Sequence, residues 1–276
     1  MDKVSRSAVR TYRRAILTHG GAGSDPQHSD GPQAAAQIGM DLLDKGESAL
    51  KAAVCAVRHL ENDPRFNAGS GSQLRIDGRT IQLDAACMTS DGAFGAVACL
   101  EGVRNPIDLA CGVLLESPHI LLTGEGARIF ARDQGIPLLP LPDHPNTRAP
   151  GDAPSCDTVG AVVFDGTSFA SALSSGGIFT AALGRVGDVP LPGCGLYCGP
   201  AGAVACTGYG EQIALKILAR EVYGWLERSL NPADAERKAR GLFHAAMQFG
   251  IIILTPTDCA ASASDGMAWA HMTEYE

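Results

Sequence analysis

A proline-rich stretch without periodicity divides this sequence into two halves built in the same style. Residues 136–156, IPLLPLPDHPNTRAPGDAPSC, have no apolar period and are predicted to form an exposed loop. In each half, runs typical of strands flank two runs with helical periodicity. Because both halves supply strands to one core, we expect a single domain, residues 1–276, of the α+β class. The predicted arrangement is a four-layer αββα sandwich, with two antiparallel sheets face to face and helices outside.

The first half is predicted to contain these elements in order. Strands cover 15–23, 92–100 and 119–124, and helices cover 32–46, 48–63, 105–117 and 125–135. Residues 72–88 alternate around Asp77 and Gly78, which predicts a hairpin.

The second half is predicted to begin with a pair of strands. Residues 158–175 form that pair around Asp165 and Gly166, and a further strand covers 201–208. Helices follow at 211–228 and 232–249, and a final set of strands begins at 250.

The composition excludes several classes of partner. A net charge of −8 argues against nucleic acid or an anionic membrane, and no apolar run is typical of a membrane span or a signal peptide. Nine cysteines, an odd number scattered through apolar runs, favour reduced thiols in a cytoplasmic protein. We therefore expect a cytoplasmic protein with a small-molecule partner.

A threonine directly after the proline-rich loop offers a specific chemistry. Asp157 lies in the loop and Thr158 begins an apolar run rich in valine. If the Thr158 hydroxyl attacks the Asp157 carbonyl, the amide becomes an ester, and water then releases Thr158 as a new N-terminus. Its α-amine, with a pKa of about 7.7–8.0 in model compounds, can act as base for its own hydroxyl. An ordinary strand-initiating threonine is the alternative explanation.

The motifs around Thr158, taken in order, resemble those of one enzyme family. They are THGGAG at 18–23, FNAGSGSQL at 66–74, SPHILLTGEGARIFA at 117–131, SSGGI at 174–178, GRVGD at 184–188 and CTGYGE at 206–211. This set resembles the plant-type L-asparaginase and isoaspartyl peptidase family of N-terminal-nucleophile hydrolases, over about residues 16–255. That family has the αββα fold, and it implies self-cleavage into an alpha subunit, 1–157, and a beta subunit, 158–276. It also implies a dimer of such heterodimers.

The resemblance implies a role for each matching residue. Thr158 would be the nucleophile, and the Ser175 hydroxyl would hydrogen-bond it. The side chains of Arg185 and Asp188 would hold the α-carboxylate and α-amine of the substrate, chemistry that suits a guanidinium and a carboxylate. The oxyanion hole would come from Thr207 and Gly208, and Asn67 would lie beside the site. No cofactor is implied for catalysis.

The same resemblance implies a structural sodium ion. Its ligands would be backbone carbonyls in the segment LENDPRFNAGS. By position they belong to Leu60, Glu61, Asp63, Phe66, Ala68 and Ser70.

Two departures from the family leave two alternatives open. Asp157 stands where the asparaginases have Gly, and Asp-Thr here resembles taspase, a relative that cleaves proteins after aspartate. Asp188 argues against an endopeptidase, since an internal peptide bond offers it no free α-amine. The chain also stops at AHMTEYE, early in the last strand region of the family, so a truncated inactive relative with a binding role is the other alternative.

Overall fold

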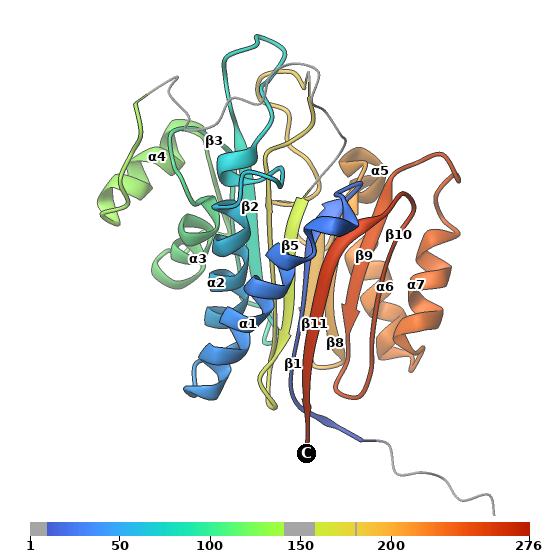
Figure 1. Ribbon diagram of the computed structural model, residues 1–276. Helices are drawn as coiled ribbons and strands as arrows, with labels where there is room; N and C mark the ends of the chain where they lie inside the picture. Colours follow the sequence, from blue (N-terminus) through green and yellow to red (C-terminus); the bar gives the residue numbers. More distant parts are fainter. Residues whose placement is uncertain (1–9, 141–157, 180) are drawn as a thin grey trace, which may run out of the picture.

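The protein folds into two antiparallel-rich sheets with helices on their outer faces (Figure 1). The computed structural model describes residues 10–140, 158–179 and 181–276. Asp157 and most of the proline-rich loop therefore lie outside the described residues. Within the described ranges, no helix combines the length and the apolar character that crossing a membrane requires.

The larger sheet has seven strands in the order β11-β1-β5-β6-β2-β3-β4. Their bounds are β1 Tyr12–Ala22, β2 Leu83–Thr89, β3 Phe94–Leu100, β4 Leu121–Thr123, β5 Thr158–Phe164, β6 Phe169–Ser175 and β11 Met267–Tyr275. All neighbouring pairs are antiparallel except β3 and β4. Because β5 lies between β1 and β6, the strand that begins at Thr158 is central and paired on both sides.

The smaller sheet has four strands in the order β10-β9-β8-β7. Their bounds are β7 Leu196–Gly199, β8 Gly202–Gly208, β9 Phe249–Leu254 and β10 Cys259–Ala263. An apolar core fills the space between the two sheets, with Leu17, Val162 and Leu173 from the larger sheet and Ala205 and Ile252 from the smaller one. The two halves of the chain therefore share one core.

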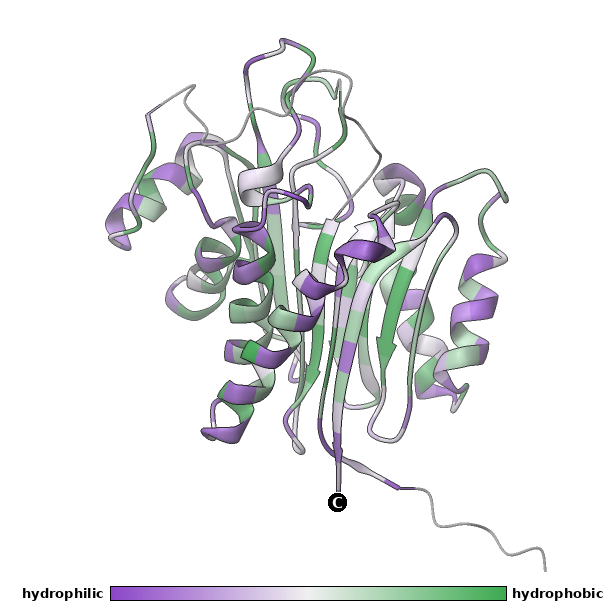
Figure 2. Cartoon of the chain, in the orientation of Figure 1, coloured by the Kyte–Doolittle hydropathy of each residue, from purple (hydrophilic) through white to green (hydrophobic). Residues whose placement is uncertain are grey.

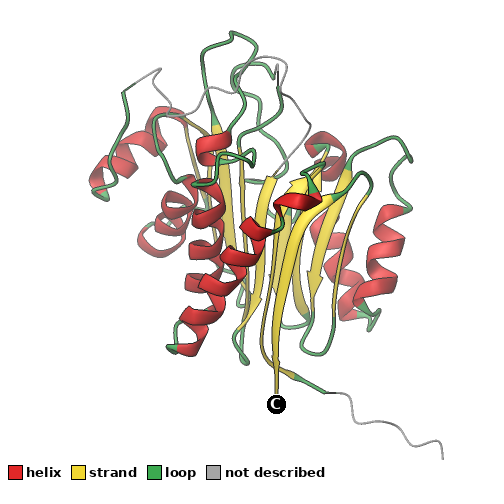
Figure 3. Ribbon diagram, viewed as in Figure 1, coloured by secondary structure: helices red, strands yellow, loops and turns green. Residues whose placement is uncertain are grey.

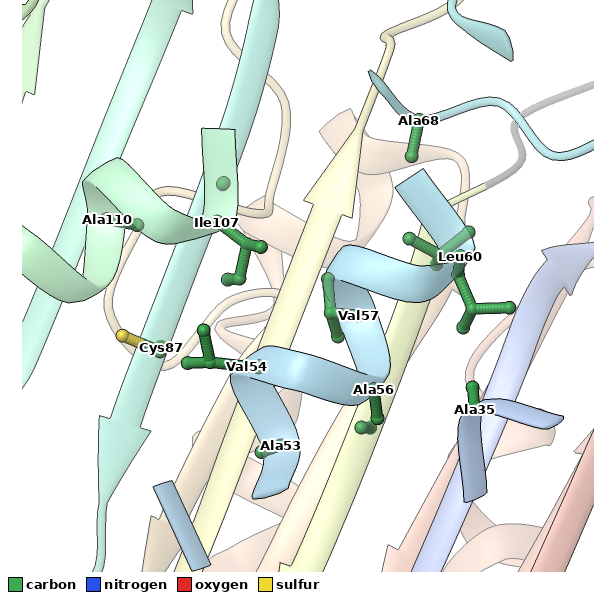
Figure 4. Close-up of a cluster of buried hydrophobic side chains, with 14 of the residues drawn as sticks. Ala35, Ala53, Val54, Ala56, Val57, Leu60, Ala68, Cys87, Ile107 and Ala110 are labelled. Atoms are coloured by element: carbon green, nitrogen blue, oxygen red, sulfur yellow. The ribbon is translucent and has the colours of Figure 1, made fainter. Parts of the chain in front are cut away.

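Helices cover the outer face of each sheet (Figure 3). On the larger sheet lie α1 Asp30–Asp44, α2 Ala49–Glu61, α3 Pro106–Glu116 and α4 Gly124–Asp133; on the smaller lie α5 Gly210–Leu215, α6 Leu218–Glu227 and α7 Pro232–Arg240. In Figure 4, Val54, Val57 and Leu60 of α2 point toward the sheet, together with Ile107 of α3. Figure 2 shows hydrophilic residues mainly on the helices and outer loops. This agrees with helices that bury one apolar face against a sheet and expose the other to solvent.

Three predicted elements need correction. The turn at Gly78 forms with φ +69, but the strand begins only at Leu83, so residues 72–82 are a loop rather than one arm of a hairpin. The predicted helix 211–228 is two helices, α5 and α6, separated at Ile217 with φ +45. The break lets Ala219 and Arg220 donate their amides to the carbonyls of Cys194 and Gly193. Helix α7 ends at Arg240 rather than near 249, with Gly241 as its C-cap.

Candidate active site

Thr158, Ser175 and Asp84 form a row across three neighbouring strands. Thr158 on β5 lies opposite Ser175 on β6, and Ser175 lies opposite Asp84 on β2. Residues directly opposite in antiparallel strands project from the same face of a sheet. The alternation of β5 places Thr158 on the same face as Val162, which is the face that meets the second sheet.

A pocket opens where this row ends. It is lined by Thr158, Ser175, Asp84, Arg185, Asp188 and Gly208, together with four neighbouring residues. Thr158 is only 4% exposed, so an attacking hydroxyl there is shielded from bulk water. The structure thus brings together five residues predicted for the site and adds an acid, Asp84, to them.

Ser175 and Asn67 shape the glycine turn beside Thr158. The Ser175 hydroxyl accepts a hydrogen bond of 3.1 Å from the Gly177 amide. The Asn67 side chain donates to the Gly177 carbonyl at 2.6 Å, and its backbone carbonyl accepts from the Gly176 amide at 2.9 Å. A Cβ on Gly176 would lie 2.3 Å from Asn67 Oδ1, which explains why this position needs glycine. Asn67 is fully buried behind the turn and is not among the pocket-lining residues.

Arg185 and Asp188 project into the pocket from the segment 184–188. The Arg185 guanidinium binds Glu211 of α5 with two bonds, Nε to Oε1 at 2.8 Å and Nη2 to Oε2 at 2.9 Å. A planar guanidinium fits a carboxylate in this two-point geometry. The Nε and Nη2 edge of Arg185 is therefore occupied by Glu211, which does not itself line the pocket.

Asp188 presents a buried carboxylate oxygen to the pocket. Within the described chain, its Oδ2 has no hydrogen-bond partner. Burial raises the pKa of Asp188 to about 7, and the charge of Arg185 only partly opposes this effect. A buried carboxylate oxygen without a partner is costly, so a cationic group that binds Oδ2 would form a strong interaction.

Thr207 and Gly208 end strand β8 on the opposite wall. The Thr207 hydroxyl oxygen accepts from the Ala22 amide of β1 at 3.1 Å, a bond that joins the two sheets. Gly208 has φ +133, and a Cβ there would lie 2.4 Å from the Gln248 carbonyl oxygen. The Gly208 backbone lines the pocket directly, whereas Thr207 is fully buried next to it.

His19 is a buried histidine on β1, next to strand β5. It is fully buried on β1 opposite Gly160, and a Cβ on Gly160 would lie 2.4 Å from its Nε2. Burial lowers the pKa of His19 to about 3, so its imidazole is neutral in the physiological range. Because Gly160 leaves room for this ring, His19 fills space under the site.

The segment predicted to hold sodium is a series of tight turns. A Cβ on Gly71 would lie 1.8 Å from the Phe66 carbonyl oxygen, and one on Gly69 would lie 2.5 Å from that of Glu61. The carbonyl oxygens of Phe66 and Glu61 therefore lie close to the backbone of these two glycines. Oxygen donors of this kind suit a hard cation. Among the described residues, no cluster of His, Cys, Asp or Glu side chains could hold a metal ion.

Two acids of this region were not predicted from the sequence: Asp84, which lines the pocket, and Glu211, which binds Arg185 outside the lining. Asp84 is an acid inside the apolar run LDAACM. Because a charged residue is rare in a buried strand, its presence there could have indicated a functional residue. Glu211 follows the glycines of CTGYGE, where it looked like an ordinary first-turn acid of a helix.

Comparisons with known proteins identify the class to which this fold and site belong. The model of the family described as "Asparaginase" matches residues 12–149 and 141–276. The chain is 36% identical to the isoaspartyl peptidase/L-asparaginase of Danio rerio, covering 92% of this chain and 91% of that protein. It is also 36% identical to the plant-type L-asparaginase of Pyrococcus abyssi, over 82% of this chain and 83% of the relative. The chain belongs to the asparaginase family.

Proposed function

We propose that this protein is a self-processing threonine hydrolase that cleaves the side-chain amide of L-asparagine and of β-aspartyl dipeptides. One observation carries the proposal: the pocket that contains Thr158 is also lined by the Arg185 guanidinium and by the buried carboxylate of Asp188, whose Oδ2 has no hydrogen-bond partner among the described residues. This pair is complementary to the α-carboxylate and α-ammonium of an amino acid. The names of the relatives agree with that substrate class.

Activation begins with cleavage between Asp157 and Thr158. The Thr158 hydroxyl attacks the preceding carbonyl, and hydrolysis of the ester frees the α-amine. The products, residues 1–157 and 158–276, stay together because strands of the two products pair in one sheet: β1 of the first lies between β5 and β11 of the second, and β2 of the first pairs with β6 of the second. The proposed unit is one αββα domain of two chains.

Catalysis then proceeds through an acyl-enzyme. The free Thr158 amine takes the hydroxyl proton, and the oxygen attacks the side-chain amide of the substrate. The Thr207 hydroxyl and the Gly208 amide stabilise the negative charge that develops on the carbonyl oxygen. Ammonia or an amino acid leaves with a proton, and water releases aspartate from Thr158.

The buried Oδ2 of Asp188, which lacks a partner among the described residues, favours this function over cleavage of proteins after aspartate. An internal peptide bond supplies no ammonium group, so the buried Oδ2 of Asp188 would gain no cationic partner from such a substrate. To test the function, the processed protein is incubated with L-asparagine, a β-aspartyl dipeptide and a peptide with internal aspartate. Release of aspartate from the first two supports the proposal. Cleavage of the internal-aspartate peptide alone would overturn it in favour of the taspase-like activity.

Three further parts of the proposal concern the state of the protein. A sodium ion is proposed at the carbonyls of Leu60, Glu61, Asp63, Phe66, Ala68 and Ser70, where it would fix the turn that carries Asn67. A cytoplasmic location is supported by eight described cysteines, all of them free. A dimer of heterodimers stays a prediction from the family resemblance.

The oxyanion hole gives a quantitative prediction. Changing Thr207→Ala should lower kcat by roughly 10²–10³, the usual loss for one oxyanion donor. The KM should change less, because this donor acts mainly in the transition state. Steady-state kinetics of the fully processed variant measure both constants. Thr255→Ala is the matched control, since this threonine donates only to the nearby Asp258 carbonyl. Equal kcat values in Thr207→Ala and the wild type would mean that Thr207 only joins the sheets.

The raised pKa of Asp188 gives a prediction about pH. The ionised carboxylate binds the substrate ammonium, so its protonation below about pH 7 should weaken binding. We expect the KM for L-asparagine to rise as the pH falls through this range. Succinamic acid, which lacks the α-amine, should show no such rise. Parallel pH profiles for the two substrates would contradict this role.

A further inference from the structure

A fully buried arginine lies directly behind the pocket. Arg75 is 1% exposed, and its Nε and Nη1 have no hydrogen-bond partner within the described residues. It forms no ion pair in that part of the chain, and burial lowers the pKa of its guanidinium, an effect that the charge of Asp84 only partly opposes. An unpaired buried guanidinium is costly, so its retention needs an explanation.

The contacts of Arg75 are with the backbone that carries the substrate-binding pair. Its Nη2 donates to the Arg185 carbonyl at 3.3 Å and to the Gln82 carbonyl at 2.9 Å. Its Nη1 also lies 2.8 Å from the position of a Cβ on Gly177, a pocket residue with φ +79. The guanidinium therefore supports two walls of the pocket from outside.

Two neighbours of Arg75 hold the same segment at adjacent points. Gln82 Oε1 accepts from the Gly184 amide at 2.8 Å, and Asp84 Oδ2 accepts from the Gly187 amide at 3.2 Å. The segment 184–188 is thus fixed at three backbone positions by residues from before the proposed cleavage point. Its side chains, Arg185 and Asp188, are the proposed substrate ligands.

We propose that Arg75 is a positioning residue for substrate binding: it holds the backbone of Arg185 so that the 184–188 segment meets the substrate's α-carboxylate and α-ammonium. This inference rests on the proposed function. It adds that a residue of the proposed alpha subunit, 1–157, sets the affinity for an α-amino acid that binds to side chains of the beta subunit, 158–276. Self-cleavage does not require this positioning, because it uses neither group of a bound amino acid.

The test compares Arg75→Met with Arg75→Lys in processed protein. Calorimetry measures the Kd for L-aspartate, kinetics give kcat and KM, and a denaturing gel measures processing. We expect Arg75→Met to raise Kd and KM by about tenfold or more, as for one lost hydrogen bond of a charged group, with kcat and processing nearly unchanged. Arg75→Lys should recover part of the affinity. If Arg75→Met does not fold, Gln82→Met tests the same segment, with a rise of Kd expected.

Two results would overturn the inference. One is an unchanged Kd in these variants. The other is a parallel loss of affinity, processing and melting temperature without rescue by lysine, which would show a general structural role. Failure of the proposed activity is distinguishable, because a wild type that binds L-aspartate without hydrolysing asparagine leaves the Arg75 effect on Kd measurable.

Discussion

Changing Thr158→Ala should leave one uncut chain with no measurable hydrolase activity. The variant lacks the hydroxyl that attacks the Asp157 carbonyl, and without cleavage the base, a free α-amine, never forms. Loss of a hydrolase nucleophile typically costs about 10⁶ in kcat. A denaturing gel and intact mass check the processing, and release of ammonia from L-asparagine checks the activity.

Thr158→Ser is the matched control for this variant. It keeps a hydroxyl at the same place on β5, so it should still cut itself and hydrolyse asparagine, with altered rates. Alanine is smaller than threonine and fits the buried position on β5. Thr158→Ala should therefore still fold and unfold in one cooperative thermal transition. An uncut but fully active Thr158→Ala protein would contradict the mechanism.

The second large effect is expected for Asp188→Asn. This change removes the charge opposite the substrate ammonium, and losing one partner of a buried charge contact costs about 2–5 kcal/mol. The kcat/KM for L-asparagine and β-aspartyl dipeptides should therefore fall by roughly 30-fold to several thousand-fold. Self-cleavage should be nearly unaffected, since no ammonium takes part in it. Kinetics and a processing gel on the same preparation measure the two effects.

A surface carboxylate provides the control for Asp188. Asp91 lies in the exposed turn between β2 and β3, where it accepts from the Thr89 hydroxyl and the Ala93 amide. Asp91→Asn should leave both reactions unchanged. If Asp188→Asn hydrolyses asparagine as the wild type does, Asp188 does not bind the ammonium, and a substrate without a free α-amine would fit the site better.

Local patterns predicted the elements around Thr158 correctly. Strands β5 and β6 and their turn at Gly166, which has φ +96, follow from a valine-rich run, an Asp-Gly pair and a second apolar run. The motif resemblance supplied Arg185, Asp188 and Gly208, and these residues do line one pocket with Thr158.

Nonlocal pairing explains what the sequence could not predict. Asp84 joins the site only because β2 pairs with β6 in a register that aligns it with Ser175. The break at Ile217 depends on carbonyls more than twenty residues earlier in the chain, those of Gly193 and Cys194. Arg75 looked like part of an alternating hairpin strand, and only the tertiary fold places its guanidinium against the Arg185 backbone.

The central claim is that hydrolase activity arises from cleavage between Asp157 and Thr158. The most direct measurement follows freshly purified wild-type protein over time by intact mass, with asparaginase activity recorded in the same samples. We expect the full chain to convert into two fragments, 1–157 and 158–276, and the activity to rise in proportion to the fragments. Activity in protein that remains uncut, or cleaved protein without activity on asparagine or β-aspartyl dipeptides, would contradict it.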